Sequence, residues 1–185
     1  MKINLTGITD DGGFVSLNPG RYAVATKSEW SAKMNDNGNL VIRVPFTVLD
    51  KGDFEGASSS YFHTIMLDGP ADKLRTNKVF TFRLLASLGL ISESDQGPKG
   101  ELEIEFEYGD KDDQGRAPVT ALVVNGDRRG LGDKKAVAVV VLSDSTQSGV
   151  QVKALEPNGK PDAAVTAAPT QQTAAPQDPT KKFPF

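Results

Sequence analysis

Apolar and polar residues alternate in three runs that predict the strands of a β-meander. Arg21–Trp30 is the first predicted strand, Leu40–Leu49 the second and Tyr61–Leu67 the third. The polar spacer between the first two contains Asn37-Gly38, a dipeptide typical of tight hairpin turns. We therefore expect consecutive antiparallel strands at the centre of the fold.

The second predicted strand has one apolar face and one face with a cation. The apolar face consists of Leu40, Ile42, Val44, Phe46 and Val48. Arg43 stands in the middle of the other face. Because successive side chains of a strand point to opposite sides, the apolar face is expected in the core. Arg43 is then expected to meet solvent or a ligand.

A helical pattern follows the meander. Phe80, Leu84 and Leu88 recur at i, i+4 and i+8, which predicts one buried stripe along a helix. Asn77 is a suitable N-cap, and Gly89 stands where helices commonly end. The helix is therefore expected from Asn77 to Leu88.

Other apolar runs predict the remaining strands, which are Met1–Ile8, Glu101–Tyr108, Pro118–Val124 and Ala136–Leu142, with Gln147–Leu155 as a further candidate. Six or seven short strands with a single helix favour a mainly β fold. A small closed or partly open barrel is the expected architecture. A two-sheet sandwich is the alternative.

The composition changes after Ser143. Residues 156–182 consist mainly of Pro, Ala, Thr and Gln, with almost no large apolar side chain. Such a segment cannot bury enough apolar surface to offset the entropy of ordering it. We therefore expect a folded domain over residues 1–143 and a disordered tail over residues 144–185.

Composition also bounds the compartment and the partners. The 185 residues include no cysteine, which excludes disulfides and fits a reducing compartment. No apolar run approaches the roughly 18 residues that cross a bilayer, and Met1–Asp11 lacks the apolar segment of a secretory signal. A cytoplasmic protein with no membrane partner is expected. The net charge of −3 leaves nucleic acid open as a partner, because a local basic stripe suffices for phosphate binding.

Groups for catalysis or metal binding are sparse. His63 is the only histidine, and neither a G-x-S-x-G nucleophile motif nor a phosphate-binding P-loop is present. Glu101, Glu103, Glu105 and Glu107 alternate along one predicted strand. Neighbours in such a row lie about 7 Å apart, too far to bind one ion directly. We expect a solvated acidic face, no cofactor, no metal site and no enzyme activity.

Cations and aromatic residues remain as candidates for binding. Cations that follow a phosphate backbone, together with aromatic rings on which bases stack, are typical of proteins that bind single-stranded nucleic acid. The candidate residues are Arg21, Lys27, Trp30, Lys33, Arg43, Tyr61, His63, Arg128, Arg129, Lys134 and Lys135. Arg43 is expected to be flanked by Tyr61 and His63, which share a strand face. Alternatively, Trp30 and Tyr61 belong to the core or its rim, and the cations only keep the protein soluble.

The order of these motifs resembles that of a phage family of single-stranded DNA-binding proteins. Leu17–Tyr22 resembles the family's P-x-G-x-Y opening, Gly52–Gly56 its G-x-x-x-G loop, and Leu84–Leu90 its helix ending in Leu-Gly. The resemblance covers about residues 18–124. It implies an oligonucleotide-binding (OB) barrel that binds single-stranded DNA without sequence preference in phage replication or recombination. A structural or virion-associated phage protein is the alternative, and a homodimer stays open.

The end of the chain resembles the tails of bacterial single-strand binding proteins, which close an acidic tip with Pro-Phe. Here Asp178 is the only nearby acid, and Lys181-Lys182 replace the acidic run. The resemblance implies that Phe183, Pro184 and Phe185 form a docking peptide for replication or recombination proteins. The departure at the tip indicates a partner pocket that differs from the usual basic one.

Overall fold

The computed structural model describes residues 17–97, 101–144 and 150–158. Within these ranges the chain forms nine strands in one antiparallel sheet and a single α-helix, so the prediction of a mainly β fold with one helix is confirmed. The predicted strand Met1–Ile8 and the docking peptide Phe183–Phe185 lie outside the described residues.

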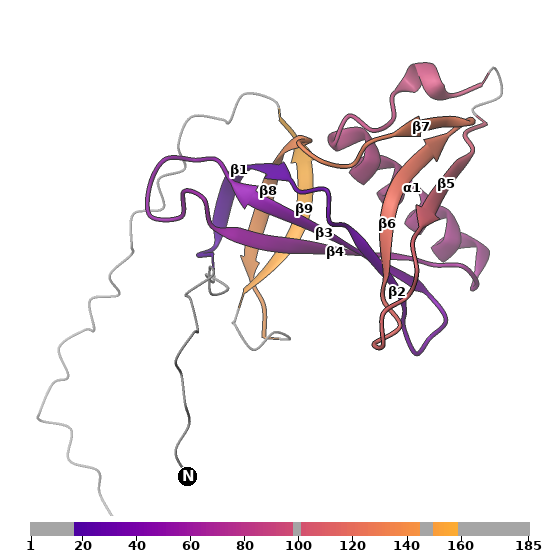
Figure 1. Ribbon diagram of the computed structural model, residues 1–185, viewed down its shortest axis with the longest axis horizontal. Coiled ribbons are helices and arrows are strands. Elements are labelled where there is room, and N and C mark those ends of the chain that lie inside the picture. The colour runs from indigo at the N-terminus through magenta and orange to yellow at the C-terminus, as the bar shows by residue number, and fades with distance from the viewer. Residues whose placement is uncertain (1–16, 98–100, 145–149, 159–185) are drawn as a thin grey trace, which may run out of the picture.

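The elements are arranged along the chain as shown in Figure 1. They are β1 (Gly20–Thr26), β2 (Ser31–Met34), β3 (Leu40–Val48), β4 (Ser58–Ile65), α1 (Ala71–Ser87), the short 3-10 helix η1 (Glu93–Asp95), β5 (Ile104–Tyr108), β6 (Ala117–Val124), β7 (Asp127–Arg129), β8 (Lys135–Leu142) and β9 (Val150–Pro157).

The central strand of the sheet is β3. Strand β4 pairs along one edge of β3, from Leu40 opposite Ile65 to Thr47 opposite Ser58. The other edge of β3 pairs first with β2 and then with β1. From there the ladder continues on one side through β6 to β5, and on the other through β8 to β9, while β7 pairs with β6.

Among the described residues the sheet does not close into a barrel, so the closed form of the expected closed or partly open barrel is wrong, and nine strands replace the expected six or seven. Strands β4 and β9 approach each other, but the described pairings include no ladder between them. Helix α1 is hydrogen-bonded to both instead. Ser87 Oγ donates to the carbonyl oxygen of Leu155 in β9, and Asn77 Nδ2 donates to that of Thr64 in β4.

The first predicted strand is divided in two. Strand β1 ends at Thr26 and β2 begins at Ser31, because the two segments continue into different neighbours, β8 and β6. At this junction Lys27 N donates to Pro45 O at 2.8 Å. N–H and C=O of one strand residue point to the same side, so the N–H that Pro45 lacks would face Lys27 at the end of the β1 ladder and not β4, and the ladder of β3 with β4 loses no donor.

The inner face of β3 forms the centre of the core, as predicted. Ile42, Val44, Phe46 and Val48 are each at most 2% exposed. Leu40, at the end of the strand, is partly buried against the same cluster.

Helix α1 begins six residues before the predicted start, after Pro70 at its N-cap position. The predicted N-cap Asn77 lies inside the helix, and its side chain binds the end of β4: Oδ1 accepts from Met66 N at 2.9 Å. The predicted stripe is wrong at Phe80, which is 53% exposed, because Thr81 occupies the inward position beside β4.

The predicted end of the helix is confirmed. Gly89 has φ +63°, the left-handed conformation that glycine adopts at low cost. Its N–H donates to Ala86 O, and Leu90 N–H donates to Leu85 O, both at 2.9 Å. These two hydrogen bonds satisfy carbonyl groups of the last helical turn, and the chain then turns into the core at Leu90.

Residues 150–157 form β9, which pairs with β8 over its whole length. The further strand candidate Gln147–Leu155 is thus confirmed from Val150 to Leu155, and residues 150–157 of the expected tail belong to the sheet. The described helix is too short and too polar to cross a membrane.

Candidate nucleic-acid interface

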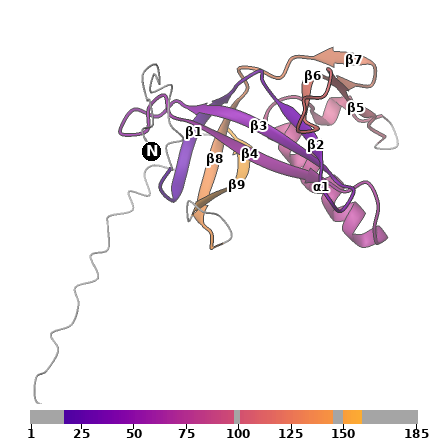
Figure 2. The ribbon, with the colours of Figure 1, turned by 60° about the horizontal axis from the view of Figure 1, so that its bottom comes forward.

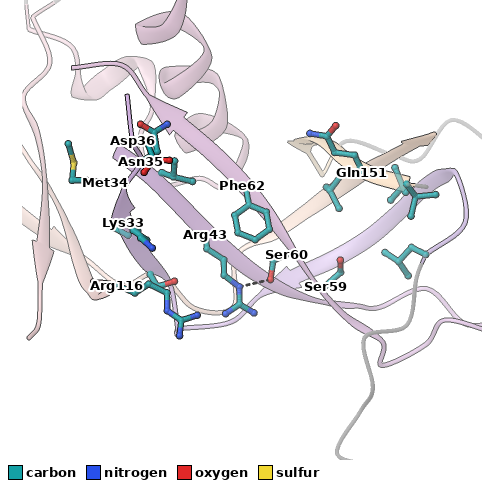
Figure 3. Close-up of a pocket in the computed structure, with 17 residues that line it drawn as sticks. Lys33, Met34, Asn35, Asp36, Arg43, Ser59, Ser60, Phe62, Arg116 and Gln151 are labelled. Atoms are coloured by element: carbon teal, nitrogen blue, oxygen red, sulfur yellow. Dashed lines mark hydrogen bonds between the residues drawn. The ribbon is translucent and has the colours of Figure 1, made fainter. Parts of the chain in front are cut away.

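A groove with a volume of about 820 Å³ lies on the outer side of β2, β3 and β4 and reaches the start of β9. Figure 3 shows its polar side chains converging from several elements. Its lining residues include Lys33 from β2, Asp36 from the following turn, Arg43 from β3, Ser59, Ser60 and Phe62 from β4, and Arg116 before β6.

The register between β3 and β4 places an arginine beside an exposed aromatic ring. Arg43 stands directly opposite Phe62, and cross-strand partners share a face of the sheet. Phe62 is 62% exposed. Arg43 Nε donates to Ser60 Oγ at 2.9 Å, which ties the guanidinium to the neighbouring strand β4 (Figure 3). This pair is the centre of the candidate interface.

The expected flanking of Arg43 by Tyr61 and His63 is wrong. Their cross-strand partners are Val44 and Ile42, two core residues, so both rings point to the inner face. The rings stack with centroids 6.1 Å apart. Neither ring lines the groove.

The inner pair joins β4 to α1. Thr81 Oγ1 donates to Asn77 O at 3.0 Å, and the same Thr81 Oγ1 lies 2.8 Å from His63 Nε2. Because the hydroxyl hydrogen points to Asn77 O, Oγ1 accepts from Nε2–H of the neutral ring. Nδ1 then carries no hydrogen and faces the Tyr61 hydroxyl at 3.5 Å. Burial lowers the pKa of His63 and raises that of Tyr61, so both groups are neutral.

Trp30 is also corrected as a binding residue. It is 1% exposed and belongs to the core. Its ring follows the junction between β1 and β2, where Val119 N donates to Trp30 O at 2.9 Å. A base could not stack on this indole without opening the core.

The cations of the groove are held differently from one another. Lys33 is exposed, and no carboxylate lies within ion-pair distance of Lys33 or Arg43 in the part of the chain that the structure describes. Arg116 Nε pairs with Asp112 Oδ2 at 3.0 Å. Asp112 also accepts from backbone N–H groups, which lower its pKa. Asp36 lines the same groove. The groove therefore contains three cationic side chains and one carboxylate among its lining residues.

The predicted arginines of the 125–135 loop are committed to ion pairs. Arg129 binds Asp95 through two nitrogens, at 2.6 and 3.1 Å, and donates to Leu90 O at 2.6 Å. The hydrogen bond from Arg129 holds the pKa of Asp95 well below its usual range. Arg128 pairs with Glu107 at 2.7 Å. Arg129 thus joins β7 to η1 and the end of α1.

The remaining predicted cations lie outside the groove. Arg21 pairs with Glu156 of β9, and Lys27 Nζ donates to Ser58 Oγ at 2.9 Å. Lys134 donates its backbone N–H to Thr26 Oγ1, and Lys135 is exposed at the start of β8. Of the eleven predicted residues, only Lys33 and Arg43 line the groove.

Sequence reasoning missed Phe62, Arg116 and the hydroxyl groups of β4. The signal for Phe62 was its position between two residues that share the inner face. Alternation alone places Phe62 on the face opposite Tyr61 and His63. Arg116 carries no such signal, because it approaches the groove from the turn before β6.

Comparison with known proteins assigns neither a family nor a function to this chain. No protein-family model matches the chain, and no curated protein matches it. Within the described ranges, no group of three or more His, Cys, Asp or Glu side chains could hold a metal ion. The geometry of the groove therefore carries the functional interpretation.

Proposed function

We propose that this protein binds single-stranded DNA without sequence preference, and that it serves phage DNA replication or recombination. The observation that carries the proposal is Phe62, exposed in the groove directly opposite Arg43. An exposed phenylalanine offers a face on which any base can stack, and the nearby cations can follow the phosphates.

The polar groups of the groove suit a backbone better than base edges. Lys33, Arg43 and Arg116 supply positive charge, and Ser59 and Ser60 supply hydroxyl groups. Contacts to phosphate and sugar position a strand but carry no sequence information. Stacking on Phe62 is equally tolerant, which fits binding without sequence preference.

The strand order supports an OB-like interpretation. The path β4-β3-β1-β8-β9 contains five strands, β9 approaches β4, and α1 follows β4. An OB fold is a five-stranded, partly open barrel that binds oligonucleotides on the face of its second and third strands. In this chain those positions belong to β3 and β4, and β5 to β7 are an insertion before the fourth strand.

The test compares fluorescent oligo-dT with duplex DNA of equal length. Wild-type protein should bind oligo-dT more tightly, and Phe62→Ala should lose about 1–3 kcal/mol of binding free energy. Phe80→Ala is the matched control, because Phe80 is similarly exposed on α1 outside the groove. On an oligo-dT short enough for a single molecule, this variant should bind like the wild type.

Three outcomes would contradict the proposal: equal affinity for duplex, no binding at all, or unchanged affinity in a folded Phe62→Ala variant. Absence of nucleic-acid binding in a protein that assembles into large particles would instead favour the structural or virion-associated alternative.

The proposed recruitment of replication or recombination proteins depends on Phe183, Pro184 and Phe185. A short Phe-Pro-Phe sequence is a compact docking element, since proline limits the conformations that binding must freeze. Deleting these three residues should leave the melting temperature and oligo-dT affinity unchanged and abolish pull-down of purified replication or recombination proteins. Capture that survives the deletion would remove the tip from the proposal.

A further inference from the structure

Helix α1 carries apolar and basic residues on the side that faces solvent. Thr76, Val79, Phe80 and Arg83 follow one another at i, i+3, i+4 and i+7, which aligns them in one stripe. Val79 is 43% exposed and Phe80 53%. This stripe, with Arg75 beside it, is called the helix face below.

The charge of α1 is strongly positive and is not neutralised by ion pairs within the part of the chain that the structure describes. The helix contains the cations Lys73, Arg75, Lys78 and Arg83 and one acid, Asp72. None of these cations has an ion-pair partner among residues 17–97, 101–144 and 150–158. The exposed apolar groups of the helix are thus surrounded by uncompensated positive charge.

The outer side of β5 has the opposite character. Phe106 enters the core, so the alternating Glu103, Glu105 and Glu107 stand on the other side of the strand. Glu107 binds Arg128, but Glu103 and Glu105 have no cation partner in the described part of the chain. Val123 is half-buried and stands opposite Glu105. Glu103, Glu105 and Val123 are called the strand face below.

The two faces cannot meet within one molecule. Figures 1 and 2 place α1 on one side of the ladder of β5 and β6. Leu84, Leu85, Phe106 and Leu122 belong to the one core cluster. The helix face points away from this core on one side, and the strand face points away from it on the other.

We propose that the helix face of one copy of this chain docks on the strand face of a second copy. The charges are complementary, and each face adds a small apolar centre, Phe80 and Val79 on one and Val123 on the other. Such a contact joins two different surfaces, so a pair of molecules still has one free helix face and one free strand face. Repetition of the contact adds further molecules, into a ring where the rotation closes and into an open chain where it does not.

The contact leaves the groove free, because none of its residues lines that groove. If the groove binds single-stranded DNA, as proposed above, neighbouring molecules on one strand are held at a high effective concentration. A weak contact then makes binding cooperative. This consequence rests on the proposed function, whereas self-association in solution does not.

The experiment uses full-length protein with charges reversed on one face at a time. Arg75→Glu with Arg83→Glu makes the helix face acidic, and Glu103→Lys with Glu105→Lys makes the strand face basic. Sedimentation velocity at low salt should show concentration-dependent association of the wild type, and neither double variant alone should associate. The equimolar mixture should associate again, because every contact between unlike variants joins opposite charges. Lys51→Glu with Lys111→Glu, exposed outside both faces, is the control with the same change of net charge as the helix-face variant.

A binding experiment with long and short oligo-dT tests the contact between copies separately from the proposed DNA binding. Oligo-dT long enough for several molecules should bind the wild type and the mixture about 5–150-fold more tightly per molecule than either double variant alone. A short oligonucleotide for one molecule should bind all of them equally. Failure of every protein to bind the short oligonucleotide would overturn the proposed function only.

The proposal itself is overturned if the wild type stays monomeric both alone and on the long oligonucleotide. It is also overturned if the double variants associate as the wild type does, or if mixing them restores nothing. Loss of association in the Lys51→Glu, Lys111→Glu control would contradict it as well, since net charge rather than the two faces would then be responsible.

Discussion

Tyr61 and Phe62 are neighbours in β4, yet they belong to different regions of the molecule. Tyr61 faces Val44 and stacks on His63 inside the core, whereas Phe62 faces Arg43 in the outer groove. Both are aromatic, and they are adjacent in the sequence. The side of the sheet decides whether an aromatic residue of this strand stabilises the fold or is available to a ligand.

The same contrast separates the cations. Among the described residues, the side chain of Arg43 in the groove donates to the neutral hydroxyl of Ser60 and has no carboxylate partner. Arg129 in β7 is held by the carboxylate of Asp95 and the carbonyl of Leu90. A cation whose charge is already balanced gains less from a phosphate than one whose charge is not, so the groove and the β7 region should respond differently to substitution.

The largest expected effect is on the inner region. Trp30→Ala should lower the free energy of unfolding by about 3–5 kcal/mol, because it removes a large, fully buried side chain. Urea unfolding followed by circular dichroism measures the loss, and Trp30→Phe should recover part of it. A stable Trp30→Ala variant with weakened oligo-dT binding would show that Trp30 acts in the interface and not in the core.

A smaller effect distinguishes the two arginines. Arg43→Gln should weaken oligo-dT binding and reduce the slope of log affinity against log salt by about 1, as expected for one lost phosphate contact. Arg129→Gln should leave that slope unchanged and lower the melting temperature, because Asp95 loses its partner. Affinity measured at several salt concentrations, with thermal unfolding of both variants, tests the pair. An unchanged slope for Arg43→Gln would show that its guanidinium does not reach phosphate.

The smallest effect concerns pH and the inner region alone. His63 has a lowered pKa in the folded protein because it is buried, so the unfolded chain binds a proton more readily. Stability should therefore be full above the unfolded value of about 6.5 and fall as pH decreases toward the folded pKa, by at most about 1.4 kcal/mol per pH unit. His63→Gln, which keeps a donor for Thr81, should flatten stability between pH 5.5 and about 7.5. An equal slope in this variant would assign the pH dependence to other groups.

Much of the sheet could be predicted, because its strands obey local rules. The apolar face of β3 and the turn at Asn37-Gly38 were both predicted from alternation and turn chemistry. The turn forms with Gly38 at φ +72°, and Asn35 Oδ1 accepts from the N–H groups of Asn37 and Asn39. Each of these features depends on residues close in sequence.

The register of β4 could not be predicted in the same way. A shift of one residue exchanges the inner and outer faces of a strand, and the sequence of β4 is not cleanly alternating, with serines at its start and aromatic residues on both faces. The loop between β3 and β4 fixes the register, and its geometry is not evident from Gly52 and Gly56 alone. The expected placement of Arg43 between Tyr61 and His63 was wrong for this reason.

The division of the first predicted strand could have been inferred from a local feature of the sequence. Proline is rare inside a central strand, and Pro45 stands in the middle of β3. Its position marks the place where β3 changes partner from β2 to β1. The ion pairs of Arg128 and Arg129 had no such sign, because Glu107 and Asp95 are brought to them only by the folded sheet.

The pairing of β1 with β8 also has a consequence for the order of folding during synthesis. Arg21 of β1 pairs with Glu156 of β9, 135 positions later in the chain, and β1 forms its longest ladder with β8. Folds that depend on such distant pairings form slowly, since a long loop must close before the contacts compensate for it. The hairpin of β3 and β4 is available early, but one edge of β1 waits until β8 has left the ribosome. A growing chain therefore presents an unpaired, partly apolar edge for most of its synthesis, which is the period when association with other chains is most damaging.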